Sequence, residues 1–120
     1  MIVQMLIAEM HDRYALAECL QAYTEHVVPL LAKAQGLRAA YLAAEEGESF
    51  LAIVTLVWTS REASVAWLHG GAHRTLYGAI RPYTRGDVIT KFFRIERTVL
   101  CEGPDCSPRE SLSPREKEEK

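Results

Sequence analysis

The sequence lacks a marked charge of either sign and any long apolar run. Its 120 residues carry 14 Lys and Arg against 16 Asp and Glu, a formal net charge of −2. That balance excludes a strongly basic nucleic-acid-binding protein. No stretch approaches the roughly 20 apolar residues of a membrane span, and no basic flank precedes the apolar residues at the start, as it would in a signal peptide. These absences predict a cytoplasmic protein that binds neither nucleic acid nor membrane.

Cysteine is scarce as well. The chain has only 3 cysteines, an odd number that implies no disulfide framework. Cys19 lies in an amphipathic stretch and is interpreted as a small buried apolar residue. Cys101 and Cys106 flank a predicted turn, and the pattern leaves open whether they pair. The glycine pair at 70–71 lacks the lysine of a phosphate-binding loop.

The excess negative charge lies at the C-terminal end. Residues 1–100 hold ten basic and ten acidic side chains, whereas residues 101–120 hold four basic and six acidic ones. The second segment repeats Ser-Pro-Arg-Glu and contains one leucine and no aromatic residue. Such a composition buries too little apolar surface to offset the entropy of ordering. We therefore predict a folded domain at 1–100 and a polar, flexible tail at 101–120.

The first hundred residues alternate between apolar runs and amphipathic stretches. Apolar residues spaced three and four apart predict a helix at 13–35, kinked at Pro29 because proline cannot donate a backbone hydrogen bond. A second helical region begins at a capping box, residues 59–62, breaks at 70–71 and ends at Pro82. Four apolar runs predict strands, at 2–10, 38–44, 49–58 and 88–99.

The resulting element order is β-α-β-β-α-β, the split pattern of ferredoxin-like α+β folds. Two helices cover one face of a four-stranded sheet and leave the other face bare. The strands nevertheless carry large apolar side chains on both faces, such as Ile53 on one and Val54 on the other. A contiguous apolar patch of that size marks an interface or a ligand site. The sequence therefore predicts a homodimer that pairs its sheet faces into an α+β barrel.

A strand that ends in tryptophan leads directly to a capped helix in Val57-Trp58-Thr59-Ser60-Arg61-Glu62-Ala63. Gly36 follows the first helix, and a histidine follows a break of small residues in Gly70-Gly71-Ala72-His73. With these features, residues 1–100 resemble the antibiotic-biosynthesis-monooxygenase-like branch of the dimeric α+β barrel superfamily. The resemblance implies small oxygenases of aromatic polyketides that use no metal or flavin, quinol oxygenases, haem-degrading enzymes, or members without known activity. A shared fold does not settle which of these applies.

Haem-degrading relatives use an asparagine after the first strand, a tryptophan in the second helix and a histidine further along that helix. By this resemblance Trp67 matches the tryptophan, Tyr77 stands in place of the histidine, and Met10 lies near the asparagine position. A tyrosine can ligate haem iron. Because the other two positions differ, we expect no cofactor, with haem as the alternative.

Side chains able to carry chemistry gather in and after the second helical region. His73 and Tyr77 can position a phenolic proton and are the predicted catalytic pair. Trp67 would form a stacking wall for an aromatic ligand, with His69 and Tyr83 as further ligand contacts. The alternative is ordinary core packing with a surface histidine. Although His69 and His73 have the spacing of a metal-binding pair, the glycines between them break the helix, so no metal is predicted.

Trp58 and Arg94 are two further candidate ligand-binding residues. Trp58 ends a strand, where a corner anchor is the alternative role. Arg94 shares a strand face with Glu96, and the alternative is that they form ion pairs across a dimer edge.

These patterns together predict a protein that binds a small apolar or aromatic molecule. The leading hypothesis is a cofactor-independent monooxygenase of a phenol, quinol or anthrone. The alternatives are a non-catalytic, stress-related binding module and a haem-binding protein.

Overall fold

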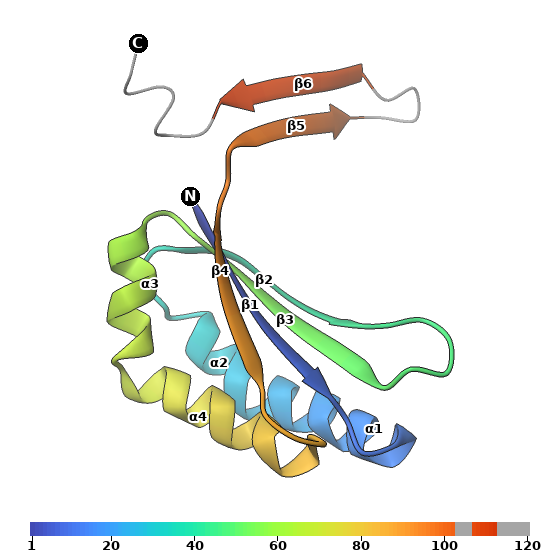
Figure 1. Ribbon diagram of the computed structural model, residues 1–120. Helices are drawn as coiled ribbons and strands as arrows, with labels where there is room; N and C mark the ends of the chain where they lie inside the picture. The colour runs from blue at the N-terminus through green and yellow to red at the C-terminus, as the bar shows by residue number, and fades with distance from the viewer. Residues whose placement is uncertain (103–106, 113–120) are drawn as a thin grey trace.

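The computed structural model describes residues 1–102 and 107–112, and within them the predicted ferredoxin-like α+β fold is confirmed. The four-stranded sheet is antiparallel in the order β2-β3-β1-β4, with the helices on one face (Figure 1). Its strands are β1 Ile2–Glu9, β2 Leu37–Ala44, β3 Leu51–Trp58 and β4 Ile89–Arg94. The helices are α1 Arg13–Ala22, η1 Tyr23–Val27, α2 Val28–Leu31, α3 Arg61–Leu68, α4 Gly71–Ile80 and η2 Arg81–Tyr83.

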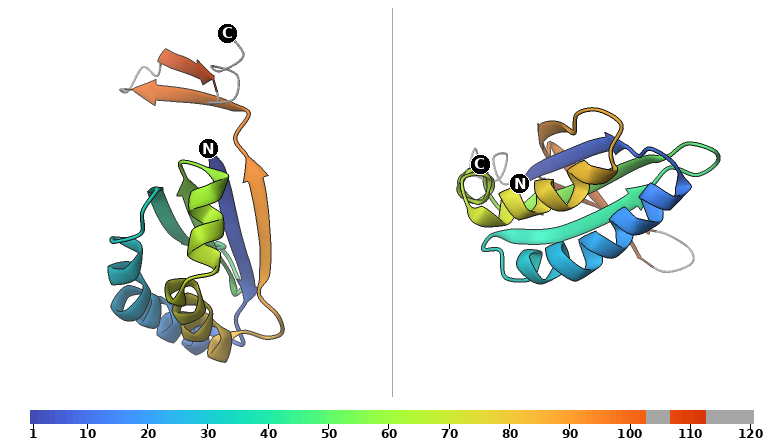
Figure 2. Two further views of the ribbon diagram at one scale, coloured as in Figure 1. Left: turned by 90° about the vertical axis from the view of Figure 1, so that its left-hand side faces the viewer. Right: turned by 90° about the horizontal axis from the view of Figure 1, so that it is seen from below.

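The hydrophobic core lies between the sheet and the helices. In β1 and β3 every second side chain is buried on the helix-covered face, as the period of a strand requires. Leu56 and Trp58 are fully buried there, and Val27 meets them from the helical layer. The helices α1 and α4 lie next to one another across this face (Figure 2).

The first helical segment differs from the single kinked helix predicted at 13–35. Between α1 and α2 the chain forms a π-helical turn, η1, in which the Val28 N–H donates to the Tyr23 carbonyl. Pro29 stands in the first turn of α2. Because proline lacks an N–H and crowds the carbonyl four residues back, a wider turn before it relieves the conflict that a regular helix would meet. The main irregularity of this helical segment is therefore a π turn on the N-terminal side of the proline.

The start of the second helical region also differs in detail. The cap of α3 is Ser60, whose Oγ accepts from the Ala63 N–H at 3.1 Å, so the predicted Thr59–Glu62 capping box is wrong. The Thr59 N–H instead donates to the Gly36 carbonyl at 2.8 Å, which adds one hydrogen bond next to the end of the β2–β3 pairing. The predicted break at the glycine pair is confirmed, since α3 ends before it.

The last predicted strand, 88–99, is two strands in the structure. β4 ends at Arg94, and the Ile95 N–H adds one more hydrogen bond, to the Met1 carbonyl at 3.0 Å, where the neighbouring strand β1 begins. The strand β5 (Arg97–Glu102) then leaves the sheet and pairs with β6 (Ser107–Leu112) as a hairpin that stands apart from the sheet (Figures 1 and 2).

The β5–β6 hairpin spans the predicted boundary between the domain at 1–100 and the tail at 101–120. The boundary at residue 100 falls inside β5, and part of the predicted flexible tail forms the regular strand β6. Regular backbone pairing therefore continues beyond the predicted domain. Cys106 and residues 113–120 lie outside the described residues.

The sheet face turned away from the helices is largely apolar, as the strand pattern predicted, with Thr55 and Lys91 as polar side chains beside Met5. Ile89 is 53% exposed and Phe93 is 47% exposed on it. None of the described residues packs over this face, since the helices all lie on the other (Figure 2). The face combines apolar residues of all four strands: Val3, Met5, Ile7, Ala39, Ala43, Leu51, Ile53, Val57, Ile89 and Phe93.

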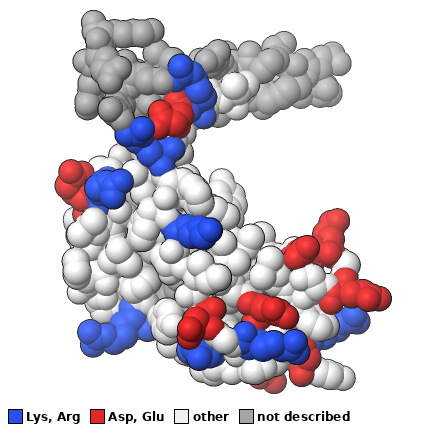
Figure 3. Space-filling model, in the orientation of Figure 1, with Lys and Arg blue, Asp and Glu red and all other residues white. Residues whose placement is uncertain are grey.

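Charged side chains gather at two ends of the molecule, beside the β4–β5 junction and at the opposite end, with a mostly uncharged surface between them (Figure 3). Both signs occur in each group, so this view shows no large field of one sign. Among the described residues, no helix is both long and apolar enough to cross a membrane.

Candidate functional site

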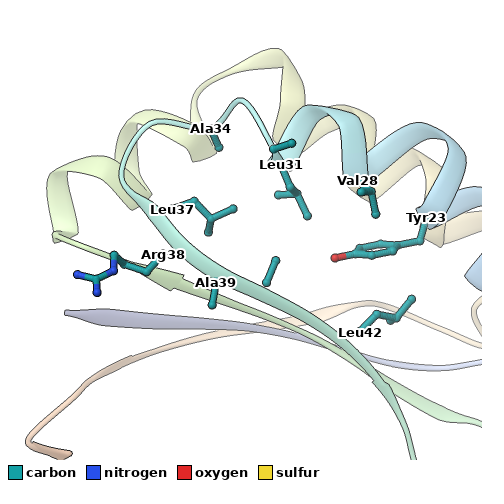
Figure 4. A pocket seen from close by; sticks show the side chains of 10 residues that line it. Tyr23, Val28, Leu31, Ala34, Leu37, Arg38, Ala39 and Leu42 are labelled. Carbon is teal, nitrogen blue, oxygen red and sulfur yellow. The ribbon is translucent and has the colours of Figure 1, made fainter.

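A cavity of about 380 Å³ opens between the helical segment η1–α2 and the edge strand β2 (Figure 4). It falls within the range of about 300–1,000 Å³ that is typical of small-molecule sites. The space exists because β2 carries alanines in its middle, opposite a helix that is only four residues long. We call it the Tyr23 cavity; its walls are Tyr23, Val28, Leu31, Ala32, Ala34, Leu37, Arg38, Ala39, Ala40 and Leu42.

Tyr23 supplies the polar group inside this cavity. Its ring is buried, with 6% of the residue exposed, and its hydroxyl points into the open space (Figure 4). Within the described residues the hydroxyl has no hydrogen-bond partner. Burial raises the pKa of Tyr23, so the phenol stays protonated at neutral pH and can donate to a ligand oxygen. Tyr23 also begins the π-helical turn, a rare element that is frequent at functional sites.

Arg38 lies at the other end of the Tyr23 cavity. The register of β2 against β3 shifts between Leu37 and Ala39, so Arg38 stands in an irregularity that redirects its side chain. Its guanidinium points away from the apolar walls, toward solvent (Figure 4). A cation at this position makes the potential at the mouth positive, which favours an anionic form of a bound ligand.

The predicted catalytic pair lies together, but in a different pocket. His69, His73 and Tyr77 line an open pocket of about 330 Å³ at the corner between α3 and α4, with Arg74 at its side. None of the three lines the Tyr23 cavity. The predicted helix residues therefore lie together, while the Tyr23 cavity is formed by other elements.

A row of three aromatic rings, of which Trp58 and Trp67 are buried and His73 is partly buried, links the sheet to this second pocket. The ring centroids of Trp67 and His73 are 4.9 Å apart, and those of Trp58 and Trp67 are 5.6 Å apart. The Trp58 Nε1–H donates to Gln4 Oε1 at 3.1 Å. Trp58 is fully buried, which is the geometry of a corner anchor between β3 and α3.

Three polar atoms along this row are buried without a hydrogen-bond partner: Gln4 Nε2, Trp67 Nε1 and His73 Nδ1. Burial lowers the pKa of His73, which keeps its imidazole neutral and able to accept a proton at pH 7. Sequence reasoning missed Gln4, although a lone polar residue inside an apolar strand was a visible signal.

Tyr83 and Arg94 lie outside both pockets. Tyr83 ends η2, where its carbonyl accepts from the His11 N–H at 3.0 Å. Arg94, at the end of β4, bonds Glu96 through its Nε at 2.6 Å, and both side chains are about half exposed. This ion pair forms within one chain, whereas the sequence suggested pairing across a dimer edge.

The described residues hold no group of three or more His, Cys, Asp and Glu side chains arranged to bind a metal ion. His69 and His73 are separated by the break between α3 and α4, so they do not share one uninterrupted helix face.

No family model matches the sequence, and no curated protein matches it. Solved structures, in contrast, do match this chain. The monooxygenase ActVA-Orf6 of Streptomyces coelicolor, in complex with Nanaomycin D, is 15% identical with a TM-score of 0.72, over 84% of this chain and 92% of that one. SnoaB, a cofactor-independent oxygenase from Streptomyces nogalater, is 18% identical with a TM-score of 0.68, over 81% and 94%.

A further crystal structure, described as an antibiotic biosynthesis monooxygenase, is 16% identical with a TM-score of 0.66 and covers 79% of this chain and 98% of its own. Identities this low establish the fold and leave the function open. The chain thus has the fold of the antibiotic biosynthesis monooxygenases, in agreement with the resemblance seen in its sequence.

Proposed function

We propose that the protein is a cofactor-independent oxygenase that acts on a small phenol, quinol or anthrone bound in the Tyr23 cavity. One observation carries the proposal: an open cavity of about 380 Å³ with largely apolar side chains receives the hydroxyl of the buried residue Tyr23, and this hydroxyl has no hydrogen-bond partner among the described residues. Apolar walls accept a flat ring, and the Tyr23 hydroxyl can donate to an oxygen on that ring. SnoaB supports the proposal as a cofactor-independent oxygenase of the same fold.

In the proposed reaction the main task of the protein is to stabilise the negative charge on the deprotonated substrate. An anthrone that gives a proton of its CH₂ group to water in the open cavity becomes an anion whose oxygen would accept the Tyr23 hydrogen bond, while Arg38 at the mouth favours the negative charge. This anion gives electrons to dioxygen. The CH₂ carbon becomes a carbonyl with one oxygen atom, the other oxygen leaves as water, and no external reductant is needed.

His73 and Tyr77 define a second proposed site for the same reaction. Its support is a neutral imidazole with an unpartnered, buried Nδ1, beside a pocket large enough for one ring. The two sites lie on different elements, so substitutions separate them.

Tyr23→Phe is expected to lower kcat/KM for oxygen uptake about a hundredfold, because it removes the one donor that stabilises the oxyanion. The measurement is oxygen consumption with a panel of anthrones and quinols. His73→Ala is expected to retain turnover. Tyr14→Phe, at an 82% exposed tyrosine on α1, is the matched control. Full activity in Tyr23→Phe with loss in His73→Ala would move the reaction to the second site.

The same assays address the two alternative functions. An aromatic ligand that binds in the Tyr23 cavity, with no oxygen consumed across the panel, would indicate a non-catalytic binding module. A Soret shift on titration with haem that is lost in Tyr77→Phe would indicate a haem-binding protein.

We also propose that two copies pair through the bare sheet face. The support is its apolar composition, since contiguous patches of this kind on monomers are rare. Sedimentation at micromolar concentration is expected to show a dimer, and Ile53→Asp is expected to yield monomer because it places a charge in the face. Val65→Asp, the same change at a 41% exposed position on α3, should leave the dimer intact. A monomeric wild-type protein would overturn this proposal.

A further inference from the structure

A small, partly enclosed void lies in the interior between the sheet and the helices α1 and α4. It leaves about 10 Å³ for the centre of a water-sized molecule, which is the lower limit for holding one such molecule. Its walls come from both layers of the fold and carry no charged or hydroxyl group: Leu6, Ala8, Met10, Cys19, Leu42, Ala52, Val54, Ile80 and Val88.

The void has a definite origin in the strand register. Ala8 of β1 and Ala52 of β3 are direct cross-strand partners, and both face the helices at 4% exposure. Two methyl side chains at adjacent positions leave a gap that valine or leucine would fill. Because protein interiors are close-packed and an unfilled gap is destabilising, the pair of alanines maintains this space at a cost in stability.

The chemistry of the walls restricts what can enter. A buried water needs two to four polar partners, and these walls offer none beyond a thiol. Burial raises the pKa of Cys19, so that thiol stays neutral and unreactive. The space therefore suits a small apolar molecule. Dioxygen has these properties, and the proposed oxygenase consumes it.

The void adjoins the Tyr23 cavity through one side chain. Leu42 lines both spaces, and it lies on the floor of the larger cavity beneath Tyr23 (Figure 4). A rotamer change of Leu42 would join the two, and such changes are fast compared with enzymatic turnover.

We propose that the void is a dioxygen site that supplies the Tyr23 cavity past Leu42. The inference rests on the proposed oxygenase function. It predicts that dioxygen occupies the void in the absence of substrate, and that filling the void weakens the use of dioxygen without weakening substrate binding.

The first test detects dioxygen directly by NMR on the full chain under dioxygen pressure. Dioxygen is paramagnetic, so methyl signals of Leu6, Val54 and Ile80 should broaden more than those of Val27, which is buried elsewhere in the core. Ala52→Val fills the void and should abolish the difference. Ala44→Val is the matched control, because Ala44 pairs with Ala52 in the same row but does not line the void.

The second test is kinetic. Ala52→Val should raise KM for dioxygen about tenfold, the effect of losing the burial of one or two small apolar groups, while Ala44→Val leaves it unchanged. Ala8→Val fills the void from the other strand, so it provides the same test of KM for dioxygen if Ala52→Val does not fold. Equal broadening in wild type and both filled variants would overturn the dioxygen site and leave the oxygenase proposal intact. Broadening at the void without oxygen uptake on any substrate would instead overturn the oxygenase proposal.

Discussion

Trp58→Ala is expected to lower the free energy of unfolding by about 4 kcal/mol, the usual cost of truncating a large buried aromatic residue. The side chain has no exposed surface and its ring packs against that of Trp67. Truncation also leaves the Gln4 Oε1 without its donor in a dry interior. Urea denaturation followed by circular dichroism measures the loss.

Trp58→Phe separates packing from hydrogen bonding at this corner. It keeps most of the apolar volume and removes only the Nε1–H, so the expected loss is about 1–3 kcal/mol for an unsatisfied buried carbonyl. Adding Gln4→Leu to Trp58→Phe should recover part of that loss, since both polar partners are then gone. A loss below about 1 kcal/mol in Trp58→Ala would contradict the central packing role given to this residue.

The second large effect is expected at Gly36, where α2 turns into β2. Its φ is +82°, and an added Cβ would lie 2.6 Å from the Ala63 Cβ on α3. Gly36→Ala combines backbone strain of about 1–2 kcal/mol with this overlap, and we expect a total loss of about 3 kcal/mol. Thermal and urea unfolding both report it.

Gly47→Ala is the matched control for the steric part. Gly47 also has a positive φ, +99°, but nothing lies within 4 Å of an added Cβ. Only the strain term applies, about 1–2 kcal/mol. Ala63→Gly combined with Gly36→Ala should restore much of the difference, because it removes the opposing methyl group. Equal losses in the two single variants would show that α3 shifts freely and that the close approach is not important.

The fold could be predicted because its determinants are local or periodic. The short, nearly continuous apolar run of Leu51–Trp58, rich in β-branched residues, predicts a strand, whereas the helices packed against it decide which of its faces is buried. The order of strands and helices then leaves few compact arrangements for the sheet. The structure departs from the prediction at two places: a π turn precedes Pro29, which cannot fit a regular helix, and Ser60 caps α3 because the Thr59 N–H is bonded to Gly36.

The candidate site was predicted less well, for a physical reason. His69, His73 and Tyr77 are neighbours along one helical region, so sequence spacing placed them together. The Tyr23 cavity joins a helix to an edge strand that follows it, and its volume depends on how far the two stand apart. No periodic pattern encodes that distance.

The sequence by itself determined the element order and the apolar character of both faces of the sheet. The tertiary structure alone decided where space remains. Tyr23 lies in the π turn and lines a cavity opposite the alanines of β2, and the void beside it lies where Ala8 and Ala52 are paired in register. A cavity is the space that the surrounding side chains leave unfilled, so its size and shape depend on the positions of all of them.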